Sequence, residues 1–305
     1  MRNLHNYTKK LAFGLVALTG VFIWSCSEEE TAVVSTSDTQ NVQGESITES
    51  SFDESNDFST IAVGGTSETL TGRTESGRTN GEVKGLGDID KRLSCAVVTV
   101  AKSANSSFDR PKGVITIDFK DGCTDAKGNV RKGQIIVTYD GRRFMLNSKI
   151  ITTFNNYYIN GIKIEGTNTL TNLTASLESA PKFKNEVTGG KVTFIDGKIA
   201  TRDHVLTREW IRGANPIQDS WKVEGSASGT TREEVSYQME ITKALVYKRS
   251  CVASKVFIAV EGTKKFTSGD RTMSIDFGKG DCDNLVTVTV NGVSKDVEIK
   301  ADGSN

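Results

Sequence analysis

The chain has 305 residues, 25% charged and 36% hydrophobic, and its formal net charge at pH 7 is zero. This length and apolar content suffice for one sizeable core, and the balanced charge gives little support to nucleic-acid binding. The charge is unevenly placed, because residues 27–72 carry 10 acidic and no basic side chains, whereas residues 73–305 carry 35 basic and 28 acidic ones. The second part contains no basic run, which is typical of a solvated β surface.

The chain begins with a basic stretch and continues as an uncharged apolar run from Leu11 to Trp24. This run of about 14 residues is shorter than the roughly 20 that cross a bilayer as a helix, so residues 1–25 are predicted to be a cleaved export signal. The run ends in Ile-Trp-Ser before Cys26, a pattern that resembles a bacterial lipobox. We expect Cys26 to be lipidated and to attach the mature chain to a membrane. An ordinary signal peptide with a stray cysteine, or an uncleaved anchor, is the alternative.

Residues 26–87 form an acidic, glycine-punctuated stretch with few apolar side chains. Low hydrophobicity, and a single sign of charge over residues 27–72, leave too little apolar area to offset the entropy of the chain. We therefore predict a disordered tether whose deletion leaves the folded domain intact. Its main apolar features, Phe52, Phe58 and Ile61, are the residues that a docking segment would use.

Residues 88–305 alternate apolar and polar side chains with a period of two, and no window has the period of an amphipathic helix. The predicted fold class is all-β, with an antiparallel meander sheet. The strands are expected at 97–100, 114–119, 135–139, 144–150, 198–212 and 235–241. Asp-Gly or Asn-Gly pairs at 140–141, 160–161 and 196–197 predict tight hairpins, because both residues tolerate positive φ.

Two segments of this domain, about 95–151 and 251–300, look like copies of one unit that flank a central β region. In each copy a cysteine precedes a Val-rich strand (97–100 or 256–260), an Ile-Asp-Phe triplet, a second cysteine and another strand. Without Cys26 the five cysteines become an even set, which in an exported chain is expected to form disulfides. Three pairings are possible, and the duplication favours Cys95 with Cys123 and Cys251 with Cys282.

The segment Gly-Lys-Gly-Asp-Cys-Asp-Asn at 278–284, followed by Val-Thr-Val-Thr-Val-Asn-Gly at 286–292, resembles the C-terminal end of a group of uncharacterised Bacteroidota envelope lipoproteins. The lipobox and the acidic run after Cys26 are similar to theirs as well. The resemblance implies a lipid anchor in the outer membrane and a β-rich domain at the cell surface, with the periplasmic face as the alternative. It implies no activity and no catalytic residues.

The sequence offers few groups for catalysis or metal binding. His204 is the only histidine outside the leader, and a lone strand histidine is more often a packing residue than a catalytic one. Carboxylates for a glycosidase are available at Asp203, Glu209, Glu233 and Glu234, but spacing does not pair them across a sheet. Loop oxygens for calcium, without an EF-hand register, occur at Asp121, Asp125, Asp281, Asp283 and Asn284. We expect no catalytic residue, no metal and no cofactor.

Four aromatic residues are possible ligand contacts: Trp210, Trp221, Tyr157 and Tyr158. They either form a platform for sugar stacking or fill a core layer at the ends of the sheet. The function that the sequence favours is a membrane-anchored, non-enzymatic module that binds a glycan or a protein and no nucleic acid. The alternatives are a glycan hydrolase with paired carboxylates and a structural component of an outer-membrane assembly.

Overall fold

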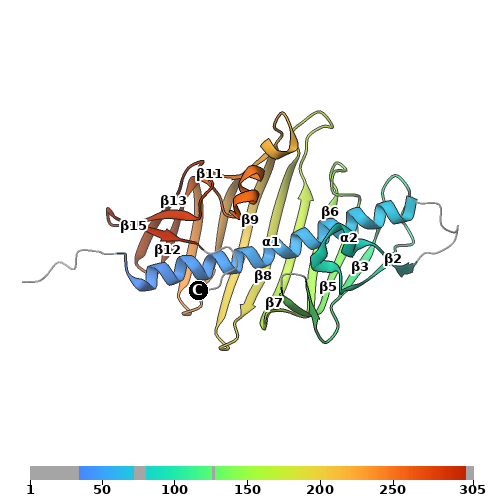
Figure 1. Cartoon of the computed structure of the whole chain (residues 1–305), viewed down its shortest axis with the longest axis horizontal. Helices are drawn as coiled ribbons and strands as arrows, with labels where there is room; N and C mark the ends of the chain where they lie inside the picture. Colours follow the sequence, from blue (N-terminus) through green and yellow to red (C-terminus); the bar gives the residue numbers. More distant parts are fainter. Residues whose placement is uncertain (1–33, 72–79, 126–127, 300–305) are drawn as a thin grey trace, which may run out of the picture. The chain divides into compact units, whose positions relative to one another are not determined.

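A computed structural model describes residues 34–71, 80–125 and 128–299 of the chain. Its strands form one 15-stranded antiparallel sheet that follows chain order, except that β4 pairs only with β5 (Figure 1). This meander confirms the predicted all-β class. The strands are β1 (Asn80–Glu82), β2 (Val97–Lys102), β3 (Lys112–Asp118), β4 (Cys123–Thr124), β5 (Val130–Asp140), β6 (Lys149–Ile159), β7 (Ile162–Asn172), β8 (Lys182–Thr193), β9 (Ile199–Ile211), β10 (Ser220–Thr230), β11 (Ser236–Lys248), β12 (Glu261–Ser268), β13 (Arg271–Lys279), β14 (Leu285–Val290) and β15 (Val293–Glu298).

Helical elements lie before and between the strands. They are α1 (Thr36–Thr71), α2 (Leu86–Ile89) and the short 3-10 helices η1 (Lys91–Leu93), η2 (Pro216–Gln218) and η3 (Arg249–Ser254). In Figure 1, α1 runs across one face of the sheet. This face is called the helix face below, and the opposite one the outer face.

Helix α1 occupies most of the segment for which disorder was predicted. That prediction was wrong for residues 36–71, and also for residues 80–87, which contain β1 and the start of α2. The helix begins with a reciprocal cap: the Ser35 backbone N–H donates to Asp38 Oδ2 at 2.8 Å, and the Asp38 N–H donates to Ser35 Oγ at 3.1 Å. The predicted leader at 1–25, Cys26 and the predicted tether residues 27–33 and 72–79 lie outside the described residues.

The predicted two-residue hairpin at Asn160-Gly161 is confirmed, because β6 and β7 flank this pair and both residues have positive φ, at 48° and 82°. The turn at 196–197 lies within a longer connection between β8 and β9. The prediction for 140–141 was wrong, since a loop over 141–148 separates β5 from β6 and replaces the start of the expected strand 144–150. Arg110 orders this loop by donating to Asp140 Oδ1 at 2.5 Å and to the Asn147 carbonyl at 2.9 Å.

The two cysteine units lie towards opposite ends of the sheet, around β2, β3 and β5 and around β12, β13 and β14. The disulfides are Cys95–Cys123 and Cys251–Cys282, as predicted. The second unit differs from the prediction in one respect, because residues 256–260 are not a strand and β12 begins at Glu261. Instead, Val256 and Val260 pack against buried Cys251.

The buried apolar residues of the helix face form two large clusters. One contains Phe52, Phe58, Ala62 and Val63 of α1 with residues of β2 to β9, and the other contains Val42 of α1 with residues of β9 to β15. The Phe52 ring lies close to the backbone of β8: a Cβ added at Gly190 would be 2.9 Å from its Cζ atom. Charged residues fill the space between the two clusters.

Candidate functional site

Four carboxylates recur at every fourth residue of α1: Glu45, Glu49, Asp53 and Asp57. Because residues four apart lie on one face of a helix, these side chains form a single acidic stripe. The stripe faces basic side chains of the sheet, and its members do not behave alike. Glu45 and Glu49 form a cluster of ion pairs with the sheet, whereas Asp53 lines two pockets and Asp57 is exposed.

The cluster of ion pairs lies near the middle of the helix. Glu45 accepts hydrogen bonds from Arg202 and, at 2.8 Å, from Lys264, while Glu49 lies 3.4 Å from the Lys264 amine. Burial alone would lower the pKa of Lys264, but Glu45 and Glu49 raise it above its ordinary value, so the amine stays charged. Each of the four side chains has an oppositely charged partner within the cluster, which indicates a structural role in holding α1 on the sheet.

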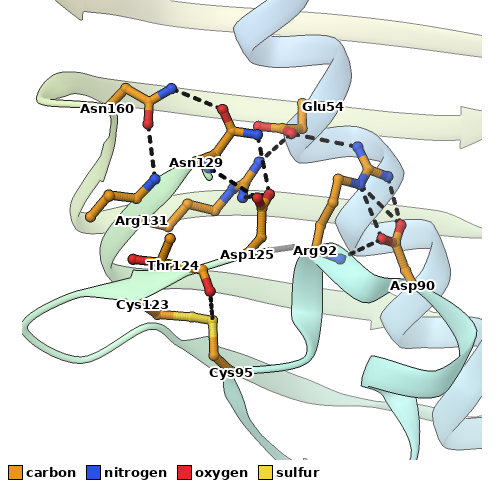
Figure 2. A network of polar contacts seen from close by, with 11 residues as sticks. Glu54, Asp90, Arg92, Cys95, Cys123, Thr124, Asp125, Asn129, Arg131 and Asn160 are labelled. Carbon is orange, nitrogen blue, oxygen red and sulfur yellow. Dashed lines mark hydrogen bonds and ion pairs between the residues drawn. A yellow bond between two sulfur atoms is a disulfide. The ribbon is translucent and has the colours of Figure 1, made fainter. Parts of the chain in front are cut away.

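A second network attaches the following turn of α1, as Figure 2 shows. Glu54 accepts from Arg131 at 2.7 Å and lies 3.5 Å from Arg92. Each arginine has another carboxylate on its far side, Asp125 at 2.6 Å and Asp90 at 2.7 Å. An arginine that pairs with two carboxylates in this way is held in a fixed orientation, so this network also indicates a structural role.

Asp53 differs from its neighbours because it lines two pockets. One has a volume of about 80 Å³ and contains Tyr247, Phe257 and Lys264 in its wall; the other, of about 20 Å³, contains Arg208. Among the described residues the Asp53 carboxyl has a single ion-pair contact, 3.4 Å from Arg208 Nη2. Burial raises the pKa of Asp53 to about 6, ahead of the lowering by Arg208.

Three aromatic residues form a row beside Asp53 on the helix face. Trp221 of β10 pairs directly with Trp210 of β9 on one side and with Tyr247 of β11 on the other. Directly opposed residues project from the same face, about 4.5 to 5.5 Å apart at Cβ. All three side chains are partly exposed, and the Arg208 guanidinium carbon lies 5.5 Å from the centre of the Tyr247 ring. The row and the Asp53–Arg208 pair are therefore neighbours.

The structure thus separates the four aromatic residues singled out in the sequence. Trp210 and Trp221 come together, whereas Tyr157 is buried in the core, where its ring centre lies 5.7 Å from that of Phe119. Tyr158 follows Tyr157 on the strand and therefore projects from the outer face, where Lys132 lies over its ring. Only the tryptophans belong to the region around Asp53.

His204 and the carboxylates considered for catalysis are dispersed. His204 is buried on the helix face, where Arg202 donates to its Nδ1 atom at 3.1 Å, and burial followed by the Arg202 charge lowers its pKa to about 3. Asp203 projects from the outer face and accepts from the Gly189 N–H, and Glu233 pairs with Lys198 in a connection between strands. Glu209 lies six residues along β9 from Asp203, about 20 Å away at the rise of a strand. The fourth, Glu234, adjoins Glu233 and has a positive φ of 61°.

The acidic loops have ordinary structural contacts. Asp125 pairs with Arg131, Asp283 accepts from the Leu285 N–H at 3.1 Å, and Asp121 and Asp281 are exposed. Within residues 34–71, 80–125 and 128–299 there is no cluster of three His, Cys, Asp or Glu side chains that could hold a metal ion.

A larger hollow than either of the pockets at Asp53 lies elsewhere, as an open groove of about 880 Å³ on the outer face of β8 to β12. Its floor is formed by the small residues of β10, including Ser226 and Ser228, between Glu240 and Lys265 on one side and Asp203 on the other. We place the candidate site at Asp53 instead. There, enclosed space, aromatic surface and a carboxyl with a shifted pKa occur together. This combination indicates a binding site more specifically than the volume of a pocket does.

Sequence reasoning missed Asp53, Arg208 and Tyr247. Two signals in the acidic segment point to a helix: carboxylates at every fourth position, and the Ser35-x-x-Asp38 pattern of a helix cap. Neither signal identifies the residues of the sheet that meet the helix.

No helix in the described part of the chain combines the length and the apolar character that a membrane span requires. No family model, curated protein or solved structure matches the chain.

Proposed function

We propose that the chain is a lipid-anchored protein of the cell envelope that binds a saccharide at the Asp53 site without transforming it. The observation that carries this proposal is the row Trp210, Trp221 and Tyr247, opposed across three neighbouring strands and partly exposed beside the Asp53–Arg208 pair. An isolated aromatic side chain on a sheet is unremarkable, but three opposed aromatic side chains, of which Tyr247 lines the pocket of about 80 Å³, offer a continuous apolar surface.

Saccharide chemistry fits this combination of groups. The C–H face of a pyranose ring packs on an aromatic side chain, while its hydroxyls need hydrogen-bond donors and acceptors at the edge of that surface. Asp53 supplies an acceptor, Arg208 supplies donors, and Tyr247 supplies both aromatic surface and a hydroxyl. A protein ligand remains the other class expected from the sequence, but the described site is a pocket with an aromatic rim rather than a flat patch.

The envelope location rests on the lipobox at Cys26 and is supported by the two disulfides, which persist in oxidising compartments. Cys26 lies nine residues before Ser35, the cap of α1. At no more than about 3.6 Å per residue, these residues span at most about 32 Å. The anchor would therefore hold the sheet close to the membrane surface. Protease treatment of intact cells, with lysed cells as the control, distinguishes the outer surface from the periplasmic face.

The proposed site can be observed through its own fluorescence. The chain has three tryptophans, and removal of the predicted leader with Trp24 leaves only Trp210 and Trp221, both in the aromatic row. Titration of this protein with a panel of oligosaccharides should give a saturable change in tryptophan emission. Trp221→Ala should abolish binding measured by calorimetry, whereas Tyr158→Ala, an aromatic deletion on the outer face, should leave it unchanged. Equal affinities of the two variants would contradict the proposal.

One observation favours a glycan hydrolase as a second candidate. Asp53 and Asp57 are one helical turn apart, and burial raises the pKa of both carboxyls. A carboxylic acid that keeps its proton near pH 6 can act as a general acid in glycoside cleavage. Hydrolysis of an oligosaccharide that stops in Asp53→Asn, with binding retained, would favour this function; intact ligand after prolonged incubation would favour binding alone.

A further inference from the structure

Arg143 lies in the loop between β5 and β6 and lines the pocket of about 20 Å³ together with Asn185 and Arg208. Its guanidinium carbon is 5.4 Å from the centre of the Phe144 ring and 5.1 Å from that of Phe183. The aromatic faces attract the cation, but they remove water from it and accept no conventional hydrogen bond. The guanidinium is thus held in place by surfaces that leave its hydrogen-bonding capacity unused.

The positive charge of Arg143 is poorly balanced by negative charges of the described chain. Among the described residues no carboxylate forms an ion pair with Arg143, and its Nε atom is buried without a hydrogen-bond partner. Burial lowers the pKa of Arg143, and the more distant charge of Asp57 opposes this only in part. Trp210 Nε1 is another buried donor without a partner in the described chain, and the one ion pair of Arg208 among the described residues is its 3.4 Å contact with Asp53. Unused donors therefore gather at one end of the aromatic row.

We propose that the saccharide bound at this site is an acidic one, whose carboxylate binds Arg143 and Arg208 while its ring packs on Trp210. This inference rests on the proposed function and narrows it to sugars of the uronic-acid class. A carboxylate offers acceptors only, and a guanidinium offers a planar set of donors that matches it. The ligand would supply the counter-charge that Arg143 lacks in the described chain.

The dimensions of the pocket agree with this arrangement. A cavity of about 20 Å³ has room for one water-sized group, so it admits an oxygen of the carboxylate and excludes the sugar ring. The ring would remain at the rim, where Phe144 and Trp210 have their centres 5.9 Å apart and Phe144 is exposed. Asn185 Oδ1 lies in the wall of the same pocket, buried and without a hydrogen-bond donor among the described residues.

The test compares uronate oligosaccharides of several stereochemistries with their methyl esters, which keep the ring and remove the charge. Affinities for the purified full-length chain are measured by calorimetry at low and high salt. Charge-assisted hydrogen bonds should make the free acid bind roughly tenfold to a hundredfold more tightly than its ester. Arg143→Gln should lower the affinity for the free acid to that for the ester. Arg142→Gln, at the neighbouring arginine that lies over Phe108, should preserve the preference.

Arg143→Lys provides a second variant should the glutamine destabilise the loop. It keeps the charge but loses the planar donor set, so it should retain only part of the preference for the acid. Equal binding of acids and esters would overturn this inference and leave saccharide binding standing. Failure of every acid, ester and neutral oligosaccharide to bind would overturn both proposals.

Discussion

Removal of Glu45 is expected to destabilise the protein more than any other loss of a single charge on α1. Its side chain is only 2% exposed and lies between Arg202 and Lys264, which are 0% and 3% exposed. Without Glu45, these two buried cations would retain only Glu49, at 3.7 and 3.4 Å. Removing one partner from a buried ion pair typically costs about 3 to 5 kcal/mol, because a charge remains without compensation. This is a large share of an ordinary free energy of unfolding of about 5 to 15 kcal/mol.

Urea unfolding at pH 7, followed by circular dichroism, measures this loss for Glu45→Ala. The control is Glu224→Ala, which removes an exposed carboxylate of β10 and should change the free energy of unfolding by less than about 0.5 kcal/mol. A double variant, Glu45→Leu with Lys264→Met, should lose less than the sum of the two single changes, because the pair is removed together. A loss below about 1 kcal/mol for Glu45→Ala would show that the apolar clusters alone hold the helix.

Three further outcomes can be measured. Phe58 is fully buried against Phe119. Phe58→Ala should therefore lower the free energy of unfolding by about 3 to 5 kcal/mol in the same urea assay. A change below about 1 kcal/mol would show that α1 does not pack on the sheet. Because the pKa of Asp53 is raised to about 6, its carboxyl binds a proton more tightly folded than unfolded, and its contribution to stability falls as the pH rises from about 4 to 6. Asp53→Asn should therefore gain stability relative to the parent across this range, whereas a constant difference would contradict the assignment. Reduction of the disulfides should add four hydrogens to the intact mass, and an unchanged mass would exclude both bonds. For sequence separations of 28 and 31, the chain-entropy model predicts a loss of roughly 3.5 kcal/mol of stability per disulfide.

The sheet was largely predictable because its information is local. Alternation with a period of two identifies strands such as β9 and β11, and the Asn160-Gly161 pair fixes the turn between β6 and β7. The two disulfides followed from the duplicated cysteine spacing. The prediction for the sheet failed at 141–148 and at 256–260. At 141–148 the deciding contact comes from Arg110, which is distant in sequence and invisible to a local pattern.

Helix α1 was missed for the same physical reason. Its buried side mixes apolar residues such as Val42, Phe52 and Phe58 with carboxylates and hydroxyls, so hydrophobic periodicity does not reveal it. The partners that make burial tolerable are remote, as with Glu45 and Lys264, 219 residues apart. The same limit applies to the candidate site. Trp210 and Trp221 were recognised as aromatic residues of interest, but Asp53 lay in the predicted tether and Arg143 lay between a predicted turn and a predicted strand.

The path of α1 has a consequence for how the protein folds and unfolds. In a meander each strand touches only its neighbours, so a sheet of this length resembles a one-dimensional array that can fray from either end. The helix contacts β13 through Asp38 and Arg271, 233 residues apart, and reaches β5 through Glu54 and Arg131. It therefore couples distant strands into one cooperative unit. It also raises the contact order, because a segment made early during synthesis must wait for β13 before it can dock, and we expect folding to be slow for that reason.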